Sequence, residues 1–147
     1  MIRPIMKIEF LLKKPCAKAT EEDAALVQDL MDTLDAHADD CVGLAANMIG
    51  VRKRVIAFSD FGDAEDFDAN LEYTNRCMLN PELVSGEEVY ATAEGCLSLS
   101  GMRNTKRFRK IVVRYQDPEM AWHEEAFEGF TAQIIQHQID HCNGRVI

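Results

Sequence analysis

Two histidines near the end of the chain, His137 and His141, have the spacing of a metal-binding pair. Residues four apart lie one above the other on a helix face, so two imidazole nitrogens can reach one metal ion. The H-E-x-x-H helix of zinc hydrolases uses this geometry, and its glutamate takes a proton from water on the metal. Gln138 occupies that glutamate's position and has no basic group. The stretch therefore predicts metal ligands on a helix that lacks the usual base.

A catalytic metal site needs a third protein ligand, and a cysteine is the best candidate here. Cys96 is favoured because Gly95 before it allows a close backbone approach and a reduced thiol binds metals strongly. Cys41, Cys77 and Cys142 are alternatives on their chemistry alone, although small buried cysteines more often fill a core. Three protein ligands would leave a fourth position for water, as in catalytic rather than structural sites.

The composition is that of a globular domain with reduced thiols. The 147 residues are 47% hydrophobic and 28% charged, which predicts a single domain over residues 1–147 and argues against disorder. No apolar run reaches the roughly 18 residues of a membrane span, and charges interrupt the N-terminus too often for a signal peptide. Five cysteines, an odd number, argue against a disulfide framework. We therefore expect a cytoplasmic protein without membrane contact.

The charge pattern limits the classes of partner. A formal net charge of −9 argues against a protein built mainly to bind nucleic acid, so no direct nucleic-acid specificity is expected. The local exception is a basic segment, residues 103–114, which holds Arg103, Lys106, Arg107, Arg109, Lys110 and Arg114. Such a run is expected to be a solvated strand edge. The alternative is docking on an anionic surface such as a ribosome, or on the carboxylate of a substrate.

Two helices are expected, one near each end of the chain. A capping-box pattern at residues 20–23 begins the first, which carries one apolar stripe and runs to about His37. The second runs from about Phe130 to Cys142 and ends at Asn143-Gly144, a usual position for a C-terminal cap. This second helix carries the histidine pair.

Short strands are expected between these helices, at residues 51–58, 77–84, 87–91, 111–115 and 121–127. Pro81 predicts that strand 77–84 is an edge or bent strand, and Ser85-Gly86 is expected to turn it toward residues 87–91. Residues 59–75 are expected to form a long loop. The pattern predicts an α+β fold with short antiparallel strands around a central metal-binding helix.

Three separated segments resemble the three motifs of the peptide deformylase family, in the same order and at similar distances. The motif Gly-φ-Gly-φ-Ala-Ala-x-Gln, with φ apolar, resembles residues 41–48, Cys-Val-Gly-Leu-Ala-Ala-Asn-Met. Glu-Gly-Cys-Leu-Ser is matched without change by residues 94–98. Gln-His-Glu-x-Asp-His is matched by residues 136–141 except at Gln138. With Asn80-Pro81-Glu82 and Asn143-Gly144, the resemblance covers most of the chain.

The resemblance implies an α+β enzyme that removes formyl from N-formylmethionyl nascent chains. It implies one divalent metal ion, ferrous iron with zinc or nickel as substitutes, bound by Cys96, His137 and His141. The backbone N–H of Leu97 would face the developing oxyanion, and position 138 would be the general base. The resemblance also implies the peptide-binding residues: Val42, Gly43 and Gly95, which would bond the main chain as an added strand does, and Phe130 and Ile134, which would line the methionine pocket.

Two acidic residues of the motifs have expected partners. Asp140 is expected to orient a neighbouring ligand or the backbone, and an exposed helix position is the alternative. Glu94 is expected to pair with Arg103, either beside the site or as an ordinary surface pair.

Three positions depart from the family pattern. Cys41 replaces a glycine, which the backbone could accommodate. Met48 replaces the glutamine whose amide helps to bind the oxyanion, and losing one such donor costs about 10²–10³ in rate. The Ala-Ala-Asn-Met pattern also resembles some Gram-positive members, so this change need not abolish activity. Gln138 replaces the general base, whose contribution is roughly 10²–10⁴.

Three functional hypotheses follow. The first is a metal-dependent hydrolase of this family, slowed by Gln138. The second is a non-catalytic, metal-containing protein that binds N-terminal peptides. The third is a globular domain without a metal, in which mutation of Cys96 would not change stability.

Overall fold

One antiparallel sheet and three helices form the protein, whose computed structural model describes residues 1–146. The sheet has the order β1-β2-β3-β4-β5, with strands β1 (Gly43–Ala45), β2 (Val55–Asp60), β3 (Thr74–Cys96), β4 (Leu99–Gln116) and β5 (Trp122–Glu128). The helices are α1 (Glu9–Leu12), α2 (Ala24–Ala36) and α3 (Gly129–Cys142), with 3-10 turns η1 (Glu21–Asp23) and η2 (Ala46–Ile49). No helix within the described residues is long and apolar enough to cross a membrane.

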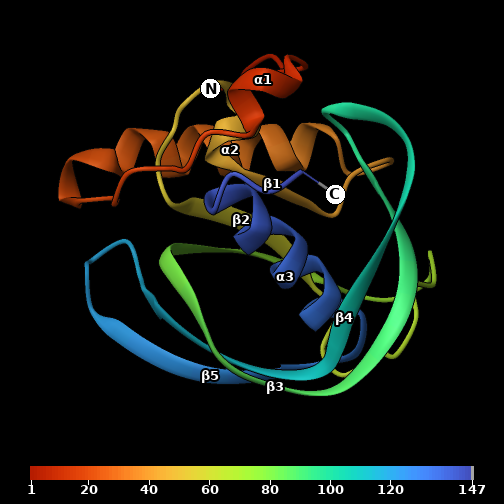
Figure 1. Ribbon diagram of the computed structural model, residues 1–147. Coiled ribbons are helices and arrows are strands. Elements are labelled where there is room, and N and C mark those ends of the chain that lie inside the picture. Colours follow the sequence, from red (N-terminus) through yellow and green to blue (C-terminus); the bar gives the residue numbers. More distant parts are fainter. Residues whose placement is uncertain (147) are drawn as a thin grey trace.

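The sheet curves around α3, and α1 and α2 lie on the far side of β1 and β2 (Figure 1). Helix α3 contacts β1, β2 and β4, while α2 packs on β2. Every residue from Ile134 to Cys142 is buried, polar and apolar alike. Because buried polar groups are costly unless they are hydrogen-bonded, the polar residues of α3 need partners from the sheet.

The helix boundaries confirm the expected caps. Thr20 Oγ1 accepts a hydrogen bond from Glu22 N–H, and Asp23 reaches back to Thr20 N–H, so the capping box is present at η1, which leads into α2. Helix α3 ends at Cys142, and Gly144 beyond it has a φ of +74°. Such a left-handed residue ends a helix readily when it is glycine.

Strands β3 and β4 are much longer than the short strands expected. The predicted turn at Ser85-Gly86 is wrong, because β3 continues through it, with a register shift between Leu83 and Ser85. Residues 87–91 pair with β4 and not with residues 77–84. Gly86 has a packing role here: a Cβ atom on it would lie 2.4 Å from the ring of Phe108.

Two other expectations for this region are confirmed. The bend expected at Pro81 is present as a register shift between Leu79 and Glu82. Residues 61–73, between β2 and β3, form no strand, which agrees with the long loop expected over residues 59–75. The strand expected at residues 51–58 begins later, at Val55.

The basic segment, residues 103–114, lies within β4, which pairs with β3 and, from Lys110 onward, with β5. The expectation of a solvated strand edge is therefore wrong for part of the segment. Arg107 is 5% exposed and points toward α3, whereas Lys106 and Arg109 remain exposed. Strand alternation separates Lys106 from Arg107, whereas Arg109 has the same strand parity as Arg107 and places its guanidinium over the ring of Tyr90 instead.

Candidate active site

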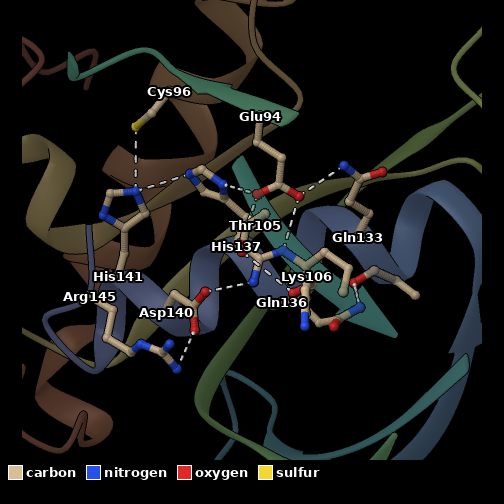
Figure 2. Close-up of polar contacts among 12 residues, drawn as sticks. Glu94, Cys96, Thr105, Lys106, Gln133, Gln136, His137, Asp140, His141 and Arg145 are labelled. Carbon is tan, nitrogen blue, oxygen red and sulfur yellow. Dashed lines mark hydrogen bonds and ion pairs between the residues drawn. The ribbon is translucent and has the colours of Figure 1, made fainter. Parts of the chain in front are cut away.

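The site begins with two imidazole rings on adjacent turns of α3. His137 and His141 are buried, with 6% and 1% exposure, and their Nε2 atoms lie 3.2 Å apart. Rings of a buried helix face would normally pack against apolar side chains. Here two nitrogens converge on one point instead (Figure 2), as the i, i+4 spacing predicts.

The third converging atom comes from the end of β3. Cys96 faces Leu99 across the tight connection to β4, and its Sγ lies 3.4 Å from His141 Nε2. Within residues 1–146, Cys96, His137 and His141 are the three side chains whose ligand atoms gather within 4.8 Å of one another. Cys41, Cys77 and Cys142, the alternative ligands, lie outside this group.

Glu94 fixes one of the two rings. Its Oε1 lies 2.8 Å from His137 Nδ1, which leaves Nε2 of that ring directed at the shared point. Burial alone would raise the pKa of Glu94, but hydrogen bonds from His137 and Arg107 outweigh burial and lower this pKa to about 2. An ionised carboxylate behind a histidine is the usual arrangement for a metal-binding imidazole.

The cysteine is held as a thiolate by its surroundings. Burial disfavours the charged form, yet hydrogen bonds with His137 and His141 lower the pKa of Cys96 to about 5. Spacings of 3.2 and 3.4 Å between the donor atoms suit metal–ligand bonds of about 2.0–2.3 Å. One thiolate and two imidazoles therefore fit a divalent metal ion in charge, donor type and spacing.

A buried arginine joins the sheet to α3 beneath the site. Arg107 donates two hydrogen bonds to Glu94, at 2.7 and 3.0 Å, and one to Asp140 at 2.7 Å. The expected pair of Glu94 with Arg103 is wrong. The two residues are opposite each other in the β3–β4 register, but the guanidinium of Arg103 lies near Glu9, 3.6 Å away.

Asp140 is 8% exposed, so the alternative of an exposed helix position is excluded. Its Oδ2 accepts a hydrogen bond from Arg107, which also donates to Glu94, and Glu94 is bonded to His137. Asp140 therefore orients the ligand His137 indirectly, through Arg107 and Glu94. Figure 2 labels Glu94, His137 and Asp140 of this chain of contacts. Arg145 lies 3.6 Å from the other carboxylate oxygen of Asp140.

Gln138 lies inside the site. It is 5% exposed, and its Oε1 has no hydrogen-bond partner among the described residues. Its amide nitrogen packs closely against Gly43, where a Cβ atom would lie 2.8 Å away. The side chain therefore occupies the position expected of the base, with a free acceptor oxygen but no group that holds a proton near neutral pH.

A cavity of about 250 Å³ opens beside these residues. The predicted site residues that line it are Val42, Gly43, Met48, Gly95, Cys96, Leu97, Phe130, Ile134, His137 and Gln138; His141 is not among the lining residues. Met48 is turned toward the backbone, and its Sδ accepts a hydrogen bond from Ala45 N–H at 3.4 Å.

An edge strand borders the cavity. Strand β1 is the terminal strand of the sheet and pairs only with β2 among the described strands. A terminal strand offers unpaired backbone groups to an extended peptide. Because Gly43 belongs to β1 and lines the cavity, a peptide pairing with this edge would reach the converging ligand atoms.

Sequence reasoning missed two residues of the site. Gln133 lines the cavity and donates to Glu94 Oε2 at 2.9 Å. Its spacing of four from His137 was a usable signal, since both then face the same side of α3. Arg107 was hidden in the basic segment. It has the same strand parity as the core residues Ile111 and Val113, but so does the exposed Arg109, so parity alone does not single it out.

A thiolate and two helical imidazoles beside a cavity and an open strand edge are typical of a mononuclear metal hydrolase that acts on extended peptides. Comparison with known proteins narrows this class. The family model for polypeptide deformylase matches residues 2–147. A peptide deformylase from Clostridium beijerinckii (strain ATCC 51743 / NCIMB 8052) is 44% identical over 147 residues, covering 100% of both chains.

Solved structures agree with these matches. The crystal structure of the peptide deformylase from Thermotoga maritima is similar with a TM-score of 0.82 and 27% identity, covering 99% of this chain and 95% of that one. The Met-Ala-Ser-bound class I type b peptide deformylase from Acinetobacter baumannii gives a TM-score of 0.83 and 26% identity, covering 99% of this chain and 96% of that one.

The chain therefore belongs to the polypeptide deformylase family. This is a family of metal-dependent hydrolases that remove the formyl group from nascent polypeptides. The α+β class expected from the sequence is confirmed by the structural likeness, and the Cys96 group is the candidate metal site.

Proposed function

We propose that this chain binds one divalent metal ion through Cys96, His137 and His141 and deformylates N-formylmethionyl peptides slowly. The observation that carries the proposal is the convergence of three ligand atoms within 4.8 Å, beside a buried Gln138 where the family has a glutamate. A bound ion of this type supplies Lewis-acid chemistry. We expect iron(II), as the family resemblance implies, with zinc or nickel as substitutes.

The residues around the cavity would bind and orient the substrate. Val42, Gly43 and Gly95 would bond the peptide main chain, which the open edge of β1 supports. Phe130 and Ile134 would hold the methionine side chain, which their place in the cavity wall supports. These contacts hold the formyl end near the ligand group.

The formyl group of the substrate would face one hydrogen-bond donor of the protein backbone. The backbone N–H of Leu97 is proposed to stabilise the developing oxyanion. Met48 has no N–H to add, and its sulfur already accepts a hydrogen bond from Ala45. We therefore expect weaker oxyanion stabilisation than a glutamine at this position would give.

Gln138 limits the proton transfers. Its free Oε1 can accept a hydrogen bond from water, which would orient the nucleophile. An amide cannot take the proton and later return it to the leaving amine, so a loss of roughly 10²–10⁴ in rate is expected. Peptide binding would be retained.

A second candidate function has its own supporting observation. The cavity and open strand edge are present while the proton acceptor is missing. These features suit a non-catalytic, metal-containing binder of N-terminal peptides. This candidate predicts peptide affinity without any product.

Turnover of formyl-Met-Ala-Ser by the metal-loaded chain and by Gln138→Glu tests the proposal. We expect the native chain to be slow and Gln138→Glu to gain about 10²–10⁴ in kcat. Metal content, measured on both proteins, should be one ion per chain. If Gln138→Glu binds metal but gains no turnover, the role assigned to position 138 is wrong. Micromolar binding without product in both proteins would favour the second candidate.

We further infer a cytoplasmic location and a transient contact with the ribosome. The five cysteines form no disulfide within the described residues, which suits a reducing compartment. The exposed side chains of Lys106, Arg109 and Arg114 on β4 support a contact with an anionic surface. Arg107 is buried and Arg103 lies near Glu9, so fewer charges are available for this contact than the sequence indicates.

A further inference from the structure

A cluster of aromatic rings lies beside the cavity, and the proposed function uses only one of them, that of Phe130. Phe61 is buried and forms its centre, with ring centroids 5.9 Å from Phe67, 5.4 Å from Tyr73 and 5.6 Å from Phe130. Phe61, Phe67 and Tyr73 all belong to loop 61–73, between β2 and β3. Phe130 belongs to the first turn of α3 and lines the cavity.

Phe67 contacts the cavity wall directly. Its ring centroid lies 5.6 Å from that of Phe130, with an angle of 44° between the ring planes. Phe67 is nevertheless 55% exposed. Its neighbours in the loop, Glu65, Asp66 and Asp68, are acidic. A half-exposed phenylalanine gains little from burial, and its ring packs against the rings of Phe61 and Phe130.

The backbone of the loop is fixed to α3 without these rings. Phe130 N–H donates to Ala64 O at 2.8 Å, and Phe61 N–H donates to Thr131 Oγ1 at 2.9 Å. The loop is therefore anchored at two points on the start of α3. Removing the Phe67 ring should leave both anchors in place, so the ring's effect can be measured separately from the loop's position.

The ring of Phe130 is packed between two rings of the loop, those of Phe61 and Phe67. Phe130 lies at the start of α3, one residue after Gly129 and before the fully buried stretch of the helix. A ring held between Phe61 and Phe67 keeps one orientation and so gives the cavity one width. From this geometry, and resting on the proposed function of the cavity, we propose that Phe67 is a positioning residue that sets the width of the pocket for the substrate's first side chain.

The proposal makes Phe67 a determinant of side-chain selectivity. Without its ring, the Phe130 side chain gains other rotamers and the pocket admits larger groups. Tyr73 offers a matched control, because it is an aromatic residue of the same loop with similar exposure, 47%, and packs on Phe61. Phe67→Leu restores an apolar contact and serves as the conservative variant.

The test measures dissociation constants of formyl-Met-Ala-Ser and formyl-Phe-Ala-Ser for the metal-loaded chain and its variants. We expect Phe67→Ala to lower the preference for the methionyl peptide by about 3- to 10-fold, the range expected for one aromatic pair. Tyr73→Ala should keep the native preference, and Phe67→Leu should recover most of it. Metal content should be the same in all four proteins.

The outcomes separate this inference from the function on which it rests. An unchanged preference in Phe67→Ala, or an equal change in Tyr73→Ala, overturns the role of Phe67 alone. If the native chain binds neither peptide, the proposed function and this inference both fail. Altered preference together with absent turnover in Gln138→Glu supports the role of Phe67 and contradicts the catalytic proposal.

Discussion

Glu94 accepts four hydrogen bonds at once, two from Arg107, one from Gln133 and one from His137. These bonds direct the carboxylate at a candidate ligand and also neutralise a buried guanidinium. A single residue thus affects both the metal site and the contact between sheet and helix. Its two roles can be measured separately.

Glu94→Gln should weaken metal binding by about 10- to 100-fold, because His137 loses the anion that orients its ring. The free energy of unfolding should also fall by about 3–5 kcal/mol, since Arg107 stays buried with Asp140 as its remaining acidic partner. Competition with a chelating dye measures the first effect, and urea unfolding measures the second.

Glu87→Gln, on the same strand but exposed, is the matched control. It should change the free energy of unfolding by less than about 0.5 kcal/mol and leave metal affinity at the native value. If both substitutions change metal affinity and the free energy of unfolding equally, Glu94 acts only through its negative charge and not through its specific contacts.

The histidine pair could be predicted from the sequence because ligand types and helical spacing are local properties. Cys96 was favoured over Cys41, Cys77 and Cys142 only by the preceding Gly95 and by the family motif at residues 94–98.

Arg107 could not be predicted in the same way. Arg103 is opposite Glu94 in the register, yet the long side chain of Arg107 reaches the carboxylate from four residues further along β4. The position of a flexible side chain depends on the twist of the strands and on the place of α3, and neither can be predicted from residue types alone.

The start of α3 is the element that places both the cavity wall and the ligands. Gly129 precedes them with a φ of +67°, and a Cβ atom there would lie 2.2 Å from Ala64 O. The helix can therefore begin close to loop 61–73 only because this residue has no side chain.

Gly129→Ala should lower the free energy of unfolding by more than about 3 kcal/mol, from the strained φ and from the clash together. Gly62→Ala separates these causes, since Gly62 has nearly the same φ, +68°, with nothing within 4 Å of its Cβ position. That variant should lose about 1–2 kcal/mol in urea unfolding. Equal losses would mean that the contact with Ala64 relaxes without cost.

At the scale of elements, periodicity and caps predicted both long helices, because these signals are local. They did not predict the length of β3. Ser85-Gly86 has the composition of a turn, but pairing with β4 on both sides extends the strand through it. The packing of Phe108 over Gly86 is a contact between strands, which propensity does not describe.

Across the whole sheet, one arginine connects four strands. Arg76 of β3 bonds to Asp60 of β2, to Glu125 of β5 and to Tyr115 of β4. The hydrogen bond from Arg76 lowers the pKa of Glu125 below its ordinary value of 4.5, against an opposing effect of burial; Tyr115 and a nearby His123 act in the same direction as Arg76. The sheet therefore has a pH-sensitive contact among residues that do not line the cavity.

The lowered pKa of Glu125 means that its contribution to stability is complete above pH 4.5 and is lost as the pH falls further. Its side chain is 39% exposed, so solvent screening limits this contribution to about 0.5–1 kcal/mol. Glu125→Gln should remove it at pH 7 and make the loss of stability between about pH 5 and 3 shallower.

Urea unfolding at pH 7 and pH 3.5 checks this, with Glu124→Gln, an exposed neighbour, as the control. The control should keep the native pH dependence. If Glu125→Gln keeps the native dependence of the free energy of unfolding on pH, residues other than Glu125 cause the acid sensitivity of the fold.

The ligands of the candidate metal site come from elements far apart in the chain. Cys96 ends β3, whereas His137 and His141 belong to the enclosed helix α3. An ion bound by these residues would also cross-link β3 to α3 and close the chain segment between them. Because the unfolded chain lacks this site, the free energy of metal binding would add to the free energy of unfolding. Metal supply would then govern how much folded enzyme a cell maintains, since chains that lack the cross-link unfold and reach proteases more often.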